Sequence, residues 1–325
     1  MKNNNILIIG GTGMVGSALQ KITKATYISS RDYDLRDPLQ CEAMYMKYKP
    51  EYAIHLAAKV GGLGANKANL ADFYYENIMI NTNVLHYAKE HKVKKLLSLL
   101  STCIYPDEAT HPLEEKDIHS GEPHTSNFAY AYAKRMLDVQ SRAYRKQYGC
   151  NFITAVPNNL YGEGDNFDLK NSHVIPAIIR KIYEAKLCNK TVILWGDGSP
   201  LREFTYAKDL AKVLLFLLAK YDEEYPINIG SSEEISIKTI AEIIAKEMNF
   251  GGEIIWDSSK PIGQFKKPSS KNKINSLGWP QAEYIKFEDG IKHTCDWFNN
   301  NYPNVRGIEY DNEQHLIKKK QLILP

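Results

Sequence analysis

A short run near the N-terminus, ILIIGGTGMVG over residues 6–16, sets the expectation for the whole fold. The apolar residues 6–9 predict a buried strand, and Gly10, Gly13 and Gly16 follow it at regular spacing. Such glycines permit a tight turn, close backbone approach to a pyrophosphate and close packing of the next helix. That helix is expected from near Ser17, with free N–H groups at its start. The run predicts a dinucleotide site, and a ligand-free glycine-rich turn is the plain alternative.

Strand-like and helix-like stretches alternate through the first half of the chain. Five apolar runs predict strands, at Ile6–Ile9, Thr26–Ser29, Tyr52–Leu56, Lys95–Leu100 and Phe152–Val156. The first and fourth runs are almost continuously apolar, which is typical of strands that helices cover on both faces. We therefore predict an α/β fold with a doubly wound parallel sheet.

The pattern changes beyond residue 165. Loops rich in Asn, Gly and Asp follow, with a helix expected from about Ile175 to Lys186. We predict a first domain over residues 1–165, which a stretch at about 203–220 rejoins, and a smaller C-terminal α/β domain over 166–325 that mainly binds substrate. The tail, residues 303–325, has no clear core pattern and receives no predicted role.

Composition excludes several classes of protein. The 325 residues are 43% apolar and 24% charged, as in an ordinary globular chain. The net charge is +3 with the basic residues scattered, so no nucleic-acid partner is expected, and no apolar run is long enough to span a membrane. The N-terminus meets glycine too soon for a signal peptide, and the five cysteines form no CxxC pair. We expect a cytoplasmic protein without a metal site.

The end of the second predicted strand indicates which dinucleotide binds. Arg31 and Asp32 follow this run directly. An acidic residue here favours the free ribose hydroxyls of NAD, whereas an arginine favours the 2′-phosphate of NADP. Arg31 therefore predicts NADP(H), although Asp32 keeps NAD open and a solvated surface arginine is the plain alternative.

Four residues predict proton-transfer chemistry. Tyr130 and Lys134 are four residues apart in a helix-prone stretch, so they share a helical face. The ammonium is expected to lower the pKa of the tyrosine, which makes the phenol an exchangeable acid; Tyr132 has no such lysine. Ser101 follows an apolar strand, at the edge where parallel sheets bind ligands, and Cys103 is close behind. A surface Tyr–Lys pair and a small buried cysteine are the plain alternatives.

With these residues and several more specific motifs, the chain resembles the GDP-L-fucose synthases of the extended short-chain dehydrogenase/reductase group. The resemblance extends to about Tyr302 and rests on AAKVGG (57–62), STCIYP (101–106), DNF (165–167), HVIP (173–176) and WG (195–196). It implies a Rossmann-type domain that binds NADP(H), a second domain that grips a GDP-sugar, and a homodimer. The implied activity is NADPH-dependent epimerisation at C3 and C5 and reduction at C4 of GDP-4-keto-6-deoxy-D-mannose.

The resemblance also implies roles for individual residues. Ser101, Tyr130 and Lys134 resemble a reductase triad, and Cys103 and His173 resemble the base and acid of the epimerisation. Cofactor contacts are implied for Gly10, Gly11, Thr12, Gly13, Met14, Val15, Gly16, Asp37, Ala57, Ala58, Lys134, Pro157, Asn158, Asn159, Leu160 and His173. Substrate contacts are implied for Arg180, Trp195, Arg202 and Lys267, whose cations suit a diphosphate.

Two positions depart from the pattern of the family. Thr12 stands where bacterial members often have an arginine for the 2′-phosphate, which shifts that role toward Arg31. Ile262 replaces an aspartate that the family uses near the nucleotide, and an apolar side chain cannot accept the same hydrogen bonds. These departures bear on cofactor choice and on nucleotide affinity.

Two competing functions stay open. The first is another extended-family enzyme, a nucleotide-sugar 4-epimerase or 4,6-dehydratase. A dehydratase is disfavoured because Cys103 and Ile104, not acidic residues, follow Thr102. The second is a non-catalytic NADP-binding regulator, which would need the glycine-rich loop but no proton donor such as Tyr130.

Overall fold

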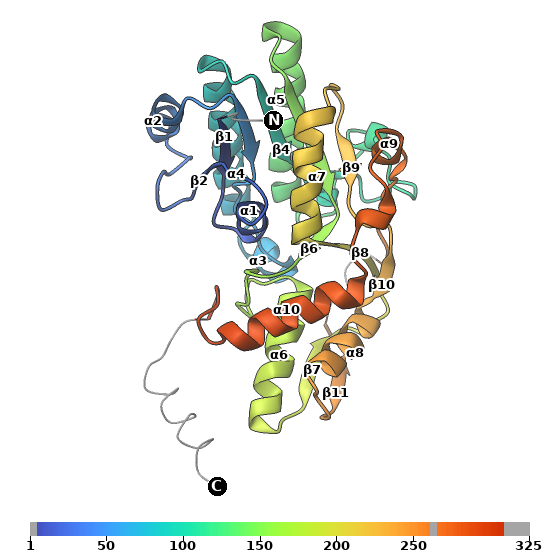
Figure 1. Ribbon diagram of the computed structural model, residues 1–325. Coiled ribbons are helices and arrows are strands. Elements are labelled where there is room, and N and C mark those ends of the chain that lie inside the picture. The colour runs from blue at the N-terminus through green and yellow to red at the C-terminus, as the bar shows by residue number, and fades with distance from the viewer. Residues whose placement is uncertain (1–4, 261–264, 309–325) are drawn as a thin grey trace.

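The structure is a computed structural model that describes residues 5–260 and 265–308 (Figure 1). Ile262 and residues 309–325 of the tail, on which the sequence analysis comments, lie outside the described residues. The described chain forms a large-sheet region built mainly from the first half, and a small-sheet region built mainly from the second (Figure 1). The predicted division at residue 165 stays a prediction.

A six-stranded parallel sheet forms the centre of the large-sheet region. Its spatial order is β2 (Thr26–Ile28), β1 (Ile6–Ile9), β3 (Tyr52–His55), β4 (Lys95–Leu99), β5 (Phe152–Pro157) and β9 (Ile227–Ile229). Five of these strands coincide with the predicted runs, which confirms the α/β class. Strand β9 is not among them, because three residues carry too weak a pattern; it pairs with β5 through Ala155 and Ile227.

Helices cover both faces of this sheet. One face packs against α2 (Pro38–Tyr48), α4 (Leu70–Glu90) and α5 (Phe128–Tyr148), and the other against α1 (Met14–Gln20), α7 (Ala207–Lys220) and α9 (Asn272–Ser276). Helix α7 comes late in the chain, yet Leu210, Leu214 and Leu217 are fully buried against β1 and β4 residues. Short helices follow β3 and β4 or join later elements: α3 (Leu63–Ala68), η1 (Thr102–Ile104), η2 (Glu115–Asp117) and η3 (Gln281–Glu283).

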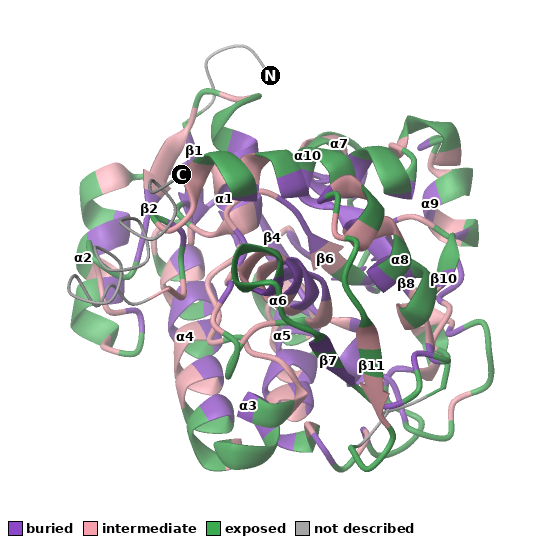
Figure 2. Ribbon diagram, turned by 90° about the horizontal axis from the view of Figure 1, so that it is seen from below, coloured by how far each residue is buried: buried purple, intermediate pink, exposed green. Residues whose placement is uncertain are grey.

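The small-sheet region contains two sheets. One has the order β10 (Glu234–Ser236), β8 (Leu201–Tyr206), β6 (Asn159–Tyr161), and the other pairs β11 (Ile254–Asp257) with β7 (Val192–Trp195) in parallel. They share a core with α6 (Val174–Cys188), α8 (Ile237–Glu247) and α10 (Phe287–Asn301). Exposed residues lie along the outer faces of peripheral helices such as α2 and α10 (Figure 2). This smaller region carries several predicted substrate residues.

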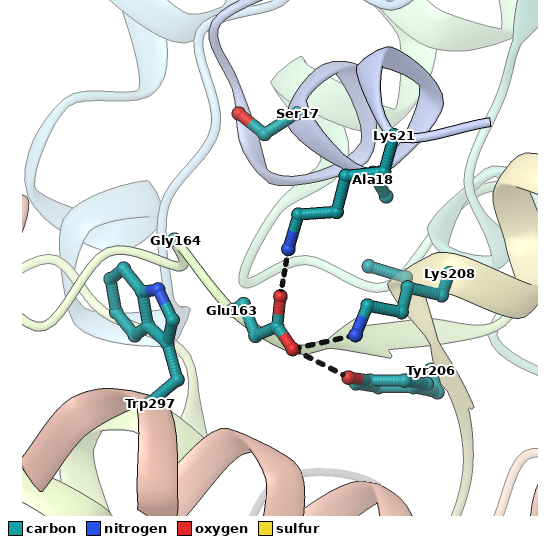
Figure 3. A pocket seen from close by; sticks show the side chains of 9 residues that line it. Ser17, Ala18, Lys21, Glu163, Gly164, Tyr206, Lys208 and Trp297 are labelled. Carbon is teal, nitrogen blue, oxygen red and sulfur yellow. Dashed lines mark hydrogen bonds and ion pairs between the residues drawn. The ribbon is translucent and has the colours of Figure 1, made fainter. Parts of the chain in front are cut away.

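One carboxylate joins the two regions. Glu163 lies between Gly162 and Gly164, whose φ angles of 152° and 76° suit glycine. Its carboxylate forms an ion pair with Lys21, which follows α1 directly, and accepts a hydrogen bond from Lys208 of α7 (2.8 Å) (Figure 3). A pocket surrounds this contact, lined by Ser17, Ala18, Lys21, Glu163, Gly164, Tyr206, Ala207, Lys208 and Trp297. None of the predicted catalytic residues lines this pocket, so it belongs to the joint between the regions.

Candidate active site

The glycine-rich loop connects β1 to α1 at the carboxyl end of the large sheet. Gly10 has a φ of +90°, and a Cβ there would lie 2.8 Å from the amide nitrogen of Ala57. At Gly16 a Cβ would lie 2.5 Å from the carbonyl oxygen of Gly11. Any larger residue at either position would displace the loop, so the sequence requires glycine there. The absence of a Cβ at these two glycines fits close approach of a dinucleotide pyrophosphate to the backbone.

Helix α1 begins at Met14 rather than near Ser17, with Gly13 as its N-cap and no capping side chain. The other predicted cofactor residues gather at neighbouring strand ends. Ala57 and Ala58 follow β3, and the residues 157–160 span the end of β5 and the start of β6. The chain reverses direction across the sheet between β1 and β3, because β2 lies on the opposite side of β1. Open α/β sheets bind ligands at such a switch point.

The charged residues after β2 differ in their hydrogen-bond partners. Asp32 accepts hydrogen bonds from the amide and the hydroxyl of Ser29, both at 2.8 Å, and these bonds lower its pKa. Asp37 caps α2 by accepting from the Leu39 amide (2.9 Å). Arg31 is exposed at the same edge. Asp32 therefore stabilises its own turn, which leaves Arg31 as the better candidate for contact with a ribose substituent.

Ser101 and Cys103 lie where β4 ends. Ser101 is the N-cap of η1, and its Oγ accepts a hydrogen bond from the Cys103 amide (3.4 Å). Helix α5 packs against η1 and brings Tyr130 and Lys134 to the same corner. Lys134 Nζ donates to the carbonyl of Leu99 (2.9 Å). The charge of Cys103 acts on the pKa of both Tyr130 and Lys134, so the four predicted residues form one cluster, the reductase corner.

The expected lowering of the Tyr130 pKa is wrong for this structure. Burial raises the pKa of Tyr130, and the negative charge of a Cys103 thiolate raises it further. The ammonium of Lys134 donates a hydrogen bond to the carbonyl of Leu99. Burial lowers the pKa of Lys134 to about 8. The sequence indicates which residues meet, but the competition between desolvation and charge depends on the depth of burial.

Burial also raises the pKa of the Cys103 thiol, whose residue is 8% exposed. Three neighbours oppose that rise: the ammonium of Lys267, the hydroxyl of Ser101 and the ammonium of Lys134. The two ammonium groups favour the thiolate, which is the form that can take a proton from an acidic C–H bond of a substrate. The geometry thus supports a base at this position rather than an inert core cysteine.

His173 is the N-cap residue of α6. The loop before it packs on the AAKVGG motif, where the Gly62 amide donates to the Asn171 carbonyl (2.9 Å). A Cβ at Gly62 would lie 2.3 Å from the carbonyl oxygen of Ser172, so glycine is required beside the residue that precedes His173. The ring is open to solvent, yet the surrounding protein and then the charge of Arg306 lower its pKa.

The four predicted substrate residues differ in their contacts. Lys267 lies within electrostatic range of both Cys103 and Arg202, because the charge of each affects its pKa. Trp195 is 56% exposed on β7. Arg180 donates to the carbonyls of Phe167 (2.9 Å) and Gly307 (3.1 Å) and forms an ion pair with Glu184 (2.8 Å). Its contact with substrate stays a prediction.

The sequence pattern does not predict two charged features near the site, Arg306 and a buried ion pair. Arg306 docks through its carbonyl on the Phe167 amide (2.9 Å) and lies within electrostatic range of Asp165 and His173. Burial raises the pKa of Asp165 to about 7. The second group is a buried ion pair between Glu203 and Lys271. No local pattern marks these residues, because each gains its partner only through long-range folding.

The described residues show neither a metal cluster nor a membrane helix. The cysteines are free thiols: Cys41, Cys103, Cys150, Cys188 and Cys295. Across residues 5–260 and 265–308, no three His, Cys, Asp or Glu side chains are grouped to hold a metal ion. No helix in these same ranges combines the length and apolarity that crossing a bilayer requires.

Known proteins resemble this chain in both sequence and fold. The NAD dependent epimerase/dehydratase family matches residues 6–230. A GDP-L-fucose synthase from Dictyostelium discoideum is 43% identical over 311 residues, which cover 93% of this chain and 97% of that protein. GDP-L-fucose synthase 1 from Arabidopsis thaliana is 40% identical, with 93% and 95% covered. The crystal structure of a GDP-L-fucose synthetase from Naegleria fowleri bound to NADP superposes with a TM-score of 0.89 at 40% identity, covering 94% of this chain and 96% of that one.

Proposed function

The chain belongs to the NAD dependent epimerase/dehydratase family, and from this membership we propose that it converts GDP-4-keto-6-deoxy-D-mannose into GDP-L-fucose with NADPH. The observation that carries the proposal is the burial of a thiol, Cys103, beside Ser101, Tyr130 and Lys134. A simple ketone reductase needs a proton donor but no second acid–base pair. The thiol supplies the base that epimerisation requires. Full-length similarity to GDP-L-fucose synthases supports the same assignment.

The residues present fit NADP(H) as the cofactor. Gly10 and Gly16 leave space that a Cβ would fill, so the backbone of this loop would hold the pyrophosphate. Arg31 would meet the 2′-phosphate, and Ala57 and Asn158 line the adjoining strand ends. The solved relative from Naegleria fowleri contains NADP. When bound, NADPH supplies the hydride that reduces the ketone carbon at C4.

The reductase corner supplies the matching proton. Ser101 Oγ holds the C4 carbonyl oxygen by donating a hydrogen bond. The Tyr130 hydroxyl gives its proton to that oxygen as the C4 carbonyl becomes an alcohol, so the alkoxide charge never builds up. Lys134 returns a proton to the phenolate that remains, and solvent reprotonates the lysine. The low pKa of Lys134, about 8, lets this lysine exchange protons near neutral pH.

Epimerisation uses a different pair. The ketone at C4 acidifies the protons on C3 and C5, and the Cys103 thiolate removes one of them to give an enolate. His173 then gives a proton to the opposite face of the same carbon, which inverts it. The surrounding protein and the charge of Arg306 lower the pKa of His173, so its protonated form gives up a proton readily. Once the thiol has lost this proton to solvent and His173 has taken one up from solvent, the same pair can invert the second centre.

Turnover with the keto sugar tests the proposal. The purified protein should oxidise NADPH only when GDP-4-keto-6-deoxy-D-mannose is present, and the product should be GDP-L-fucose by NMR. A 4-epimerase or a 4,6-dehydratase would leave NADPH unconsumed over the whole reaction. A non-catalytic regulator would bind NADP without turnover, and either result would contradict the proposal.

A homodimer built from α4 and α5 is part of the proposal. Tyr74 and Phe128 are 44% and 42% exposed on these helices. They belong to an apolar hollow lined by Leu70, Ala71, Tyr74, Phe128, Ala129, Tyr132 and Met136. A second copy that packs the same two helices against this face would cover it, on the helix that carries Tyr130. Light scattering should report a dimer for the wild type and a monomer for Phe128→Glu, and a monomeric wild type would contradict this arrangement.

We also propose a cytoplasmic location. Cys103 acts as a base only while it stays a thiol, and the cytoplasm keeps thiols reduced. Cell fractionation should recover the protein with cytoplasmic markers. Recovery with exported proteins would contradict the location without bearing on the chemistry.

A further inference from the structure

A buried ion pair lies beside the predicted substrate cations. Lys271 Nζ is 3.0 Å from Glu203 Oε2, and the two side chains are only 4% and 3% exposed. Ser269 donates to the same oxygen through its amide (3.2 Å) and its hydroxyl (2.9 Å). Burial lowers the pKa of Lys271, and the charge of Glu203 opposes that change. Apolar residues often stabilise a core as well as a buried ion pair does, so stability alone does not explain this one.

The ion pair fixes one end of the segment 265–271 to strand β8. At the other end, the Leu201 amide of β8 donates to the carbonyl of Phe265 (2.8 Å). A separate loop holds the middle, because the Leu113 amide donates to the carbonyl of Pro268 (2.8 Å). Lys267 lies between these anchors. Its backbone is therefore held from both sides.

The same contacts hold the neighbouring cation in place. Arg202 precedes Glu203 in β8, and its Nη1 donates to the carbonyls of Leu201 (2.7 Å) and Phe265 (3.3 Å). Arg202 in β8 and Lys267 in segment 265–271 thus lie on two neighbouring stretches of chain that the ion pair joins. Lys267 in turn lies within electrostatic range of Cys103.

The carboxylate of Glu203 reaches the cofactor side as well. Asn158 Nδ2 donates to Glu203 Oε2 (3.4 Å) and to the carbonyl of Ser231 (2.7 Å), and Asn158 Oδ1 accepts from the hydroxyl of Thr205 (2.6 Å). Asn158 follows β5 at the edge where the cofactor is predicted. One buried carboxylate therefore connects the strand end of the large sheet to the segment that carries the substrate cations.

We propose that the Glu203–Lys271 ion pair is a positioning element that holds Arg202 and Lys267 as one surface for the diphosphate of the GDP-sugar. The pair contacts no substrate itself. The inference rests on the proposed function, which supplies the GDP-sugar. It makes affinity for a nucleoside diphosphate depend on two side chains that lie outside the binding surface.

Calorimetric titration of GDP into the full-length protein saturated with NADP⁺ tests this inference. Lys271→Met should raise the Kd for GDP at least tenfold, and by a larger factor than the Kd for GMP, which lacks the second phosphate. Lys271→Arg should bring the Kd for GDP back to within threefold of wild type, because it restores the pair with Glu203. Lys273→Met is the control, because Lys273 lies in α9, two residues beyond the segment, and forms a separate ion pair with Glu223 (3.0 Å); it should leave the Kd within twofold.

An unchanged Kd for GDP in folded Lys271→Met would overturn the inference and leave the ion pair with a purely structural role. If Lys271→Met does not fold, Glu203→Gln replaces it, because the amide keeps an acceptor for Ser269 while it removes the charge. The same tenfold weakening is then expected, and wild-type affinity would overturn the inference. A wild-type protein that binds no GDP would instead refute the proposed function and the inference together.

Discussion

The reductase corner and the Glu203–Lys271 ion pair each contain a buried lysine, and they differ in whether a carboxylate contacts it. Lys134 is 3% exposed and donates to the carbonyl of Leu99, and no carboxylate within residues 5–260 or 265–308 forms an ion pair with it. Lys271 is also buried, and it forms an ion pair with the carboxylate of Glu203. Burial lowers the pKa of both lysines, to about 8 for Lys134, while the charge of Glu203 opposes the change at Lys271. In the functions proposed above, the lysine without a carboxylate takes part in proton transfer, and the lysine with one anchors a segment of chain.

The largest expected effect comes from removing the proton donor of the reductase corner. Tyr130→Phe keeps the ring but removes the only hydroxyl proposed to protonate the C4 oxygen, so NADPH-dependent reduction should fall about 10²–10⁴-fold. Folding should be intact by circular dichroism. Tyr132→Phe is the matched control. Tyr132 lies two positions after Tyr130 in the same helix, and its ring packs on Arg135. Equal losses in the two variants would show that the wrong tyrosine is assigned.

Exchanging each lysine for methionine tests the contrast in stability. Lys271→Met leaves the Glu203 carboxylate buried without its cation, so the free energy of unfolding should drop by about 3–5 kcal/mol. Lys134→Met loses one hydrogen bond but also removes a desolvated charge, so its change at neutral pH should stay within about 1 kcal/mol. Urea unfolding of both variants measures these changes. Similar losses would mean that the two lysines are equivalent.

The pH dependence of stability sharpens the same contrast. The pKa of Lys134 is about 8 in the folded chain, against an ordinary value of 10.5, so the unfolded chain binds this proton more tightly. Stability contributed by Lys134 must therefore rise with pH between those values, by up to about 1.4 kcal/mol per pH unit. Urea unfolding of wild type and Lys134→Met should diverge in this direction across the window. A constant difference would mean that burial does not lower the pKa.

The smallest effect is expected at an exposed cation. Arg31→Ala should raise the KM for NADPH about tenfold, because one charge-assisted contact to the 2′-phosphate is worth about 1.5 kcal/mol. The KM for NADH should hardly change. Equal changes in both constants would show that Arg31 does not contact the 2′-phosphate, and would favour Asp32 as the residue that contacts the ribose.

Local pattern predicts much of the large-sheet region. The strand at residues 6–9 and the glycines after it predict the dinucleotide edge, because backbone geometry at Gly10 and Gly16 is encoded by those residues themselves. The spacing of Tyr130 and Lys134 likewise predicts that they share a face of α5. These features depend on neighbours in sequence, so a pattern suffices.

Features that depend on distant partners could not be predicted in this way. The rise in the Tyr130 pKa follows from its burial and from the charge of Cys103, neither of which is encoded by the spacing of Tyr130 and Lys134. The pairing of Lys271 with Glu203 joins a loop to β8, and Arg306 reaches His173 only because the residues after α10 dock on Phe167. The hydrogen bonds from Arg180 to two carbonyls also join distant parts of the chain, so no local pattern predicts them.

The most direct test of the proposed chemistry is deuterium exchange in the Cys103→Ser protein. Serine keeps the shape of the side chain, but its hydroxyl has a far higher pKa than a thiol, whose ordinary value is about 8.5, so almost no base forms near neutral pH. Wild type and variant are incubated in D₂O with GDP-4-keto-6-deoxy-D-mannose, first without and then with NADPH, and deuterium at C3 and C5 is read by NMR. Exchange should nearly stop in the variant, while slow reduction gives a sugar that was never inverted. Deuterium uptake at the wild-type rate would contradict the role of Cys103 as the base.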